Sequence, residues 1–73
     1  MNKNEWEQIA ENLKNELKQS EKTQEEIANL IGIDRTNISF YLNGQTLPSL
    51  VTLKKLCFVL NCTYEDILGK PEL

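Results

Sequence analysis

A glycine interrupts the helical pattern of residues 24–43, QEEIANLIGIDRTNISFYLN, and the pattern resumes within two residues. Apolar residues recur at the three-to-four spacing of an amphipathic helix both before and after Gly32. A glycine just past the last apolar position is typical of a helix C-terminus, where a left-handed backbone is needed. Asp34 is a suitable N-cap for the next helix. The stretch therefore predicts two short helices joined by a tight turn.

Two helices joined by so short a turn must cross steeply, and this restricts the side chains near the corner. Ala28 is small enough to let the second helix come close, and Ile33 can fill the corner after the glycine. The other apolar positions turn toward the rest of the domain; they are Ile27, Ile31, Ile38, Tyr41 and Leu42. The second helix then exposes a mostly small, hydrogen-bonding surface, which comprises Asp34, Arg35, Thr36, Asn37, Ser39, Phe40 and Asn43.

The first part of the chain has the same helical spacing of apolar residues. A first helix is predicted to open with a capping box of Asn4 and Glu7 and to fade near Gln19. Its inward positions are Trp6, Ile9, Ala10, Leu13 and Leu17. Trp6 is expected at the edge of the core or packed on the first turn. Thr23, with Glu26 three residues later, forms a capping box that opens the helix before the turn.

Two further helices are predicted after the turn NGQTLPS, in which Gly44 and Pro48 stop the preceding helix. Ser49 caps a fourth helix, LVTLKKLCFVL, whose apolar face comprises Leu50, Leu53, Leu56, Cys57 and Leu60. Asn61 suits the C-terminal cap of that helix, and Thr63 caps a last short helix, YEDILG. The sequence therefore predicts an all-α fold of five helices.

The chain has 73 residues, which suffices for one small domain close to the lower size limit of a stable core. We expect a single domain over residues 1–70 and a short C-terminal tail over residues 71–73. No run of about 18 apolar residues is found, so no membrane span is predicted. The polar start has no apolar signal segment, and we expect a cytoplasmic protein.

The net charge of −3 argues, when taken alone, against a nucleic-acid partner. The distribution of charge is more informative, because the acidic residues gather toward the two ends of the chain. Residues 35–64 contain Arg35, Lys54 and Lys55 and no acidic residue. This central segment is weakly compatible with a polyanionic partner.

Cys57 and Cys62 are the only cysteines, and the chain has no histidine. A structural zinc site takes about four ligands, typically Cys and His, so two cysteines alone do not supply one. Without an imidazole, neither a Ser-His nor a Cys-His nucleophile is available. Both cysteines are interpreted as small buried hydrophobic residues, with no disulfide, metal or cofactor, and no enzymatic function is expected.

These segments together resemble the Cro/phage-repressor type of helix-turn-helix domain, also called XRE-like. The resemblance covers about residues 9–68 and is carried by TQEEIANLIGIDRTNISFYLNG and PSLVTLKKLCFVLNCTYEDIL. It implies a five-helix, lambda-repressor-like DNA-binding domain whose second and third helices form the helix-turn-helix. It also implies that the third helix, about residues 34–42, enters the major groove of duplex DNA.

The resemblance also implies roles for single residues. Gln24 corresponds to a glutamine that contacts phosphate, with Thr23 and neighbouring backbone N–H groups beside it. The loop that contacts phosphate after the third helix corresponds to Asn43, Gly44 and Gln45. The candidate base contacts are Arg35, Thr36 and Phe40, with Asn37 and Ser39 on the same outward surface.

Side-chain chemistry gives the base-contact candidates plausible partners. Arg35 can pair with guanine O6 and N7, Thr36 can bond to a base edge, and Phe40 can pack on thymine methyl groups. Arg35 is also compatible with a solvated surface charge, and Phe40 with a protein contact or partial burial. Asp34 suits an N-cap better than a DNA contact.

Three positions depart from the family pattern. Many relatives have an Arg where Leu17 stands and a partnering Glu where Leu42 stands. Replacing both members of a buried ion pair by apolar residues is often neutral or stabilising, whereas replacing one leaves a lone charge. Lys22 stands where relatives usually have an apolar residue, so the first interhelical loop is expected to sit differently.

A single short recognition helix contacts few base pairs, so useful specificity needs two copies on a palindromic operator. We predict a bacterial or phage-type transcriptional regulator that binds DNA as a homodimer, and a repressor is the favoured type. Val51 and Phe58 are candidate dimer contacts, or else incidental exposed apolar residues. The acidic composition favours weak binding by the monomer and a shallow salt dependence. The alternative is a protein-interaction module, an antitoxin or adaptor on the same fold, anchored by Phe40 and Phe58.

Overall fold

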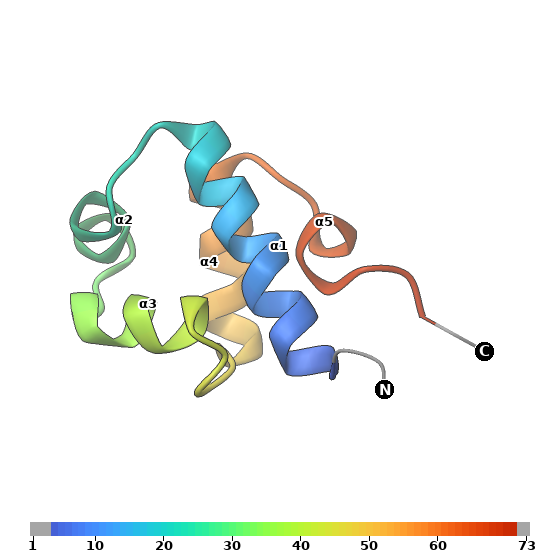
Figure 1. The fold of residues 1–73 in the computed structure, drawn as a ribbon. Helices are drawn as coiled ribbons and strands as arrows, with labels where there is room; N and C mark the ends of the chain where they lie inside the picture. The colour runs from blue at the N-terminus through green and yellow to red at the C-terminus, as the bar shows by residue number, and fades with distance from the viewer. Residues whose placement is uncertain (1–3, 72–73) are drawn as a thin grey trace.

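The computed structural model describes residues 4–71 and folds them into five α-helices (Figure 1). They are α1 (Glu5–Ser20), α2 (Gln24–Ile31), α3 (Arg35–Leu42), α4 (Leu50–Leu60) and α5 (Tyr64–Leu68). No strand is found within residues 4–71, and the predicted all-α class is confirmed. Parts of the predicted domain and tail, residues 1–3 and 72–73, lie outside the described residues.

The longest helix, α1, lies across the middle of the molecule. In Figure 1 it passes in front of α4, with α2 and α3 on one side of it and α5 on the other. α1 packs against α3, α4 and α5, and α2 packs against both α3 and α4. The apolar core between the helices comprises Ala10, Leu13, Ile27, Ala28, Ile31, Ile38, Leu42, Leu53, Leu56, Cys57, Leu60 and Ile67. Among the described helices, none is long and apolar enough to cross a membrane.

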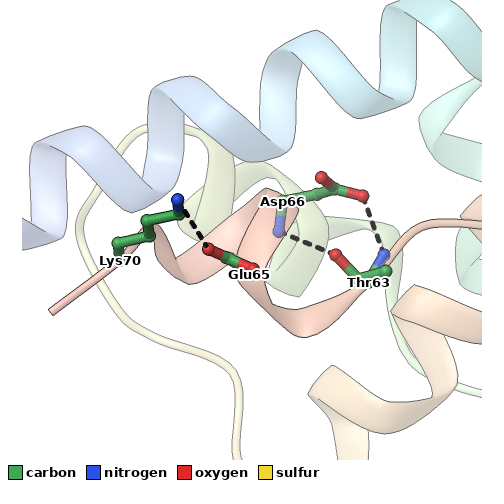
Figure 2. Close-up of polar contacts among 4 residues, drawn as sticks. All are labelled: Thr63, Glu65, Asp66 and Lys70. Carbon is green, nitrogen blue, oxygen red and sulfur yellow. Dashed lines mark hydrogen bonds and ion pairs between the residues drawn. The ribbon is translucent and has the colours of Figure 1, made fainter.

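Each helix begins at a polar residue whose side chain accepts a hydrogen bond from a backbone N–H of the first turn. The predicted N-caps are all confirmed; they are Asn4, Thr23, Asp34, Ser49 and Thr63. The capping box predicted for Asn4 is only half formed within the described residues, because Asn4 accepts from the Glu7 N–H at 2.8 Å without the reciprocal bond. Thr63 and Asp66 form a reciprocal capping box, with bonds of 2.9 and 3.1 Å (Figure 2). Because these caps satisfy N–H groups that lack an intrahelical partner, they fix where each helix starts.

The corner between α2 and α3 has the geometry that Gly32 predicts. The backbone of Gly32 is left-handed, with φ 77°. The N–H groups of Gly32 and Ile33 both donate to the Ala28 carbonyl, at 2.9 and 3.0 Å. Ala28 is buried, and Ile33 is half-buried against the core. As a result α3 leaves the corner as a separate helix and does not continue α2 (Figure 1).

One predicted core position is wrong. The apolar spacing of α4 assigns Leu50 to the core face, but its side chain is 82% exposed. Leu50 is the first residue of α4, and burial begins one turn later, at Leu53. Helical spacing predicts the direction in which a side chain points, but not how far the neighbouring helices extend over it. Trp6, at 48% exposure, lies at the edge of the core as expected.

The link from α1 to α2 contains a feature that the sequence does not signal. Glu21 adopts a left-handed backbone with φ 62°, which is uncommon for this residue type. The Ser20 hydroxyl donates to the Leu17 carbonyl at 2.6 Å and accepts from the Lys22 N–H at 3.1 Å. Leu17 is half-buried and borders the same groove as the buried Leu42.

The backbone of Gly32 gives a direct test of the corner. Gly32→Ala should lower the free energy of unfolding by about 1–2 kcal/mol, the cost of a Cβ on a left-handed backbone. No atom lies within 4 Å of the new Cβ, so a steric clash adds nothing to this cost. Gly32→Asn should cost less, because Asn adopts this conformation more readily. Urea denaturation measures both variants, and equal losses would contradict a backbone origin.

Candidate nucleic-acid interface

The two sides of α3 have different surroundings. Ile38 and Leu42 are buried and hold the helix on the core. Of the predicted base contacts, Arg35, Thr36 and Asn37 are exposed, Phe40 is 39% exposed and Ser39 is half-buried. At about 100° per residue, Thr36, Ser39, Phe40 and Asn43 share one face, with Arg35 at its edge and Asn37 to the other side. The candidates therefore form one largely exposed surface, with Arg35 and Asn37 at its margins.

An open groove adjoins this surface, between α1, the start of α2 and the end of α3. Thr23, Gln24, Ser39 and Asn43 lie along it, so the fold brings predicted base and phosphate contacts together. Its charged lining comprises Lys14, Lys18, Lys22, Glu11 and Glu21. The groove thus carries more basic than acidic groups, although the chain as a whole is acidic. This local balance suits an anionic partner.

The N-terminus of α2 opens beside this groove. Its capping box occupies the N–H groups of Thr23 and Glu26, through bonds of 2.8 and 3.1 Å. Within residues 4–71, the N–H groups of Gln24 and Glu25 have no hydrogen-bond partner. The side-chain Oε1 of Gln24 is buried and also has none. Free N–H groups at the positive end of a helix favour an anion, an effect that the Glu25 carboxylate opposes.

The loop after α3 uses its backbone amides internally. The N–H groups of Asn43, Gly44 and Gln45 donate to carbonyls of α3 at 3.0–3.2 Å. Gly44 has φ 74°, and a Cβ there would lie 3.7 Å from Ala10 Cβ and 3.8 Å from the Trp6 carbonyl oxygen. Gly44 therefore packs closely on α1. Of the three predicted loop contacts, only the exposed side chains of Asn43 and Gln45 remain available to a phosphate, a restriction that the sequence does not reveal.

The guanidinium of Arg35 stands beside an acidic N-cap. The Oδ1 atom of Asp34 accepts from the Thr36 backbone N–H at 2.9 Å. That bond, then the bond to the Thr36 side chain, and finally the Arg35 charge lower the pKa of Asp34 below its usual 3.8. Asp34 is therefore ionised at neutral pH, where it orders the first turn and weakens the positive field around Arg35.

The candidate dimer residues lie on an exposed apolar strip of α4. Phe58 is 87% and Val51 62% exposed, and seven residues separate them, so they lie on the same side of the helix. Val51 borders an apolar depression with Leu50, Tyr64 and Leu68, and Phe58 borders a second one with Leu30. Lys54 borders both. We refer to Leu50, Val51, Lys54 and Phe58 as the α4 strip.

The two cysteines lie where α4 ends. Cys57 is buried and Cys62 half-buried, as interpreted from the sequence. Burial, followed by the charges of Cys57 and Glu16, raises the pKa of the Cys62 thiol to about 12. Burial also raises the pKa of the Cys57 thiol. The sequence argument against a metal site considered only Cys and His, and it did not foresee that the fold brings the carboxylates of Glu16 and Asp66 to the Cys62 thiol.

The corner, the capped helices and the exposed side of α3 define a helix-turn-helix domain. The helix-turn-helix family model matches residues 13–67, and this chain belongs to that family. The predicted family and five-helix fold are thereby confirmed.

Two curated relatives and one solved structure are similar to this chain. Antitoxin PezA of Streptococcus pneumoniae is 34% identical over 65 residues, which cover 89% of this chain and 41% of PezA. The cryptic phage CTXphi transcriptional repressor RstR of Vibrio cholerae is 34% identical over 62 residues, which cover 85% of this chain and 55% of RstR. The chain thus spans about half the length of these relatives. The crystal structure of the restriction-modification controller protein C.AhdI from Aeromonas hydrophila superposes with a TM-score of 0.78 and 26% identity, over 85% of this chain and 94% of that one.

The acidic cap of α3 gives a pH-dependent prediction. Because the pKa of Asp34 is lower in the folded chain than its ordinary value of 3.8, the cap stabilises fully above that value and is lost as the pH falls through the folded-state pKa. Asp34→Ala should therefore be most destabilising near neutral pH and least so in acid. Urea denaturation from about pH 2 to 7 measures the difference. Asp34→Asn, which keeps a capping acceptor, is the control, and a difference for Asp34→Ala that stays constant in acid would contradict the assignment.

Proposed function

We propose that this chain binds duplex DNA sequence-specifically as a bacterial or phage-type transcriptional regulator, with α3 in the major groove. The observation that carries the proposal is the division of α3 into a buried side and an exposed side that presents Arg35, Thr36 and Phe40. A short, firmly seated helix of this kind matches the requirement for entry into the groove. Family membership and the similarity to a phage repressor and a controller protein support the same role.

In this proposal the exposed residues divide into base contacts and phosphate contacts. Arg35 pairs with guanine, Thr36 bonds to a base edge and Phe40 packs on thymine methyl groups, with Asn37 and Ser39 as flanking contacts. The phosphate contacts come from Gln24, Thr23, the free amides at the start of α2, and the side chains of Asn43 and Gln45. Gly44 supports this loop through its packing on α1. No catalytic step is part of the proposal.

The proposed complex has a modest electrostatic component. The lysines of the groove attract phosphates, but Asp34, Glu21 and Glu25 lie close to the same surface. Each neutralised phosphate contributes about one unit to the slope of log affinity against log salt. We therefore propose weak binding by a single copy, a shallow salt slope, and specificity that depends on two copies.

The proposed second copy joins through the α4 strip as a homodimer on a palindromic operator. Its support is the exposure of Phe58 and Val51 on one side of α4, next to further exposed apolar residues of α5. A two-fold dimer would bring two α3 helices to half-sites about one helical turn apart. The partner at this surface is thus a second copy of the same chain.

Selection of bound sites from random duplexes tests the DNA-binding proposal. We expect a palindromic consensus, in which Arg35→Ala flattens the preference at one position of each half-site by about 1–3 kcal/mol. Lys55→Ala on α4, which removes a positive charge away from the groove lining, is the matched control and should keep the consensus. Failure to enrich any sequence at low salt, even with a covalently dimerised chain, would contradict the proposal.

Sedimentation equilibrium tests the proposed dimer. Phe58→Lys should raise the dimer dissociation constant at least about tenfold, because it places a charge in the centre of an apolar contact. Gln19→Lys adds the same charge to an exposed position of α1 and should leave the dissociation constant unchanged. A wild-type chain that is monomeric at high concentration and on DNA would contradict the homodimer.

The second candidate function is that of an antitoxin or adaptor. The observation in its favour is the 34% identity to antitoxin PezA over 89% of this chain. Phe40 and Phe58 would then anchor a partner protein through their exposed rings. The random-duplex selection separates the two candidates, because an adaptor without DNA affinity enriches nothing.

A further inference from the structure

Three groups that can ligate a metal come together where α4 ends and α5 begins, and the Cys57 thiol lies beside them. Glu16 comes from α1, Cys57 from α4, Cys62 from the link after α4, and Asp66 from α5. One ligand atom each of Glu16, Cys62 and Asp66 lies within 4.8 Å of the others. Cys57 adjoins the cluster, because its carbonyl accepts from the Cys62 N–H at 3.0 Å and its thiol lies beside that of Cys62.

The end of α4 explains why the two thiols meet. Asn61 is left-handed, with φ 57°, and the Cys62 N–H donates to the Cys57 carbonyl at 3.0 Å. This C-terminal motif turns the chain back, so that the side chains at its two ends come into contact. The packing of α1 against α5 then carries Glu16 to the same place as Asp66.

No ion pair within residues 4–71 neutralises the two carboxylates of the cluster. Lys70 pairs with Glu65 at 4.0 Å and not with Asp66, as Figure 2 shows. The Oδ2 atom of Asp66 accepts from the Thr63 N–H at 2.9 Å. This bond orients the carboxylate and leaves lone pairs for another contact, since an ionised carboxylate has about four acceptor sites.

We propose that Glu16, Cys57, Cys62 and Asp66 together bind one divalent cation that favours thiolate ligands, such as Zn²⁺. In a tetrahedral site, bonds of about 2.3 Å to sulfur and 2.0–2.2 Å to oxygen hold neighbouring donors about 3.5–3.8 Å apart. The ligand atoms of Glu16, Cys62 and Asp66 lie within about an ångström of that spacing, and rotation of the two acidic side chains can close the gap. Each thiol releases its proton to solvent as its bond to the metal forms, so loading releases two protons per ion.

The donor set also decides which metal fits. Two thiolates select soft or borderline ions such as Zn²⁺ and Co²⁺, whereas Mg²⁺ and Ca²⁺ prefer sites made of oxygen ligands alone. A bound ion would tie α1 to the end of α4 and to α5, a helix of five residues. Because Tyr64 and Leu68 of α5 border Val51, metal binding would also stabilise the edge of the α4 strip. The proposed metal site does not depend on the proposed dimer or on DNA binding.

Metal titration of the full chain tests the site. The protein is reduced with a phosphine, stripped of metal and titrated with Zn²⁺ against a chromogenic chelator. We expect one ion per chain and a rise in the melting temperature, because the ion binds the folded state. Co²⁺ should give a thiolate charge-transfer band together with the visible bands of tetrahedral coordination, and Mg²⁺ at the same concentration should have no effect.

Single substitutions identify the ligands. Cys62→Ser and Cys57→Ser should each weaken the charge-transfer band and reduce Zn²⁺ affinity at least about tenfold. Glu16→Gln and Asp66→Asn keep side-chain volume, and the latter keeps an oxygen that can accept from Thr63; both should weaken binding. Glu65→Gln alters the neighbouring carboxylate outside the cluster and should bind as the wild type does.

Three outcomes would overturn the inference. One is Zn²⁺ binding that Cys62→Ser and Glu16→Gln leave unchanged, and another is a Co²⁺ spectrum without thiolate charge transfer. The third is a reduced wild-type chain that binds no Zn²⁺ but joins Cys57 to Cys62 as a disulfide in air. If circular dichroism shows that Cys62→Ser does not fold, Glu16→Gln and the wild-type Co²⁺ spectrum decide.

Discussion

The arrangement of the molecule depends on one hydrogen-bonded corner. The Ala28 carbonyl accepts from both Gly32 and Ile33, and the left-handed backbone of Gly32 lets the chain turn between them. The corner sets the direction in which α3 leaves α2, and therefore which side of α3 meets the core. Ile38 and Leu42 are buried as a consequence, and the opposite side faces solvent. A residue that resists the left-handed conformation strains this corner and destabilises the arrangement.

The sequence predicts features that depend on residues close together in the chain. The N-caps and the glycine turn are such features, because a cap needs only a polar residue and the first turn that follows it. Features that depend on distant segments could not be predicted in the same way. Leu50 has the spacing of a core residue, yet no neighbouring element covers the first turn of α4. The meeting of Glu16 with Cys62 is likewise visible only in the fold. The predicted outward surface of α3 is exposed except at Ser39, which is half-buried, while the contact roles of its residues stay predictions.

The proposed interface combines base-contacting side chains of α3 with a weak electrostatic attraction to DNA phosphates. Arg35 is the only basic residue of α3, and an ionised Asp34 stands beside it. The lysines of the groove are interspersed with Glu11 and Glu21, and the backbone amides of residues 43–45 are all used within the chain. A domain with so little phosphate attraction spends little time on random DNA, so discrimination has to come from base contacts and from the spacing of two copies.

The buried side of α3 stabilises the fold, and its exposed side is available for recognition. This separation has an evolutionary consequence. The core depends on Ile38 and Leu42, whereas the exposed side chains of Arg35, Thr36 and Asn37 bury little and contribute little to folding. Codon changes at these exposed positions can alter what the surface recognises while the scaffold stays intact. A duplicated gene for such a domain can drift toward a new target in a few steps, each of which yields a stably folded protein.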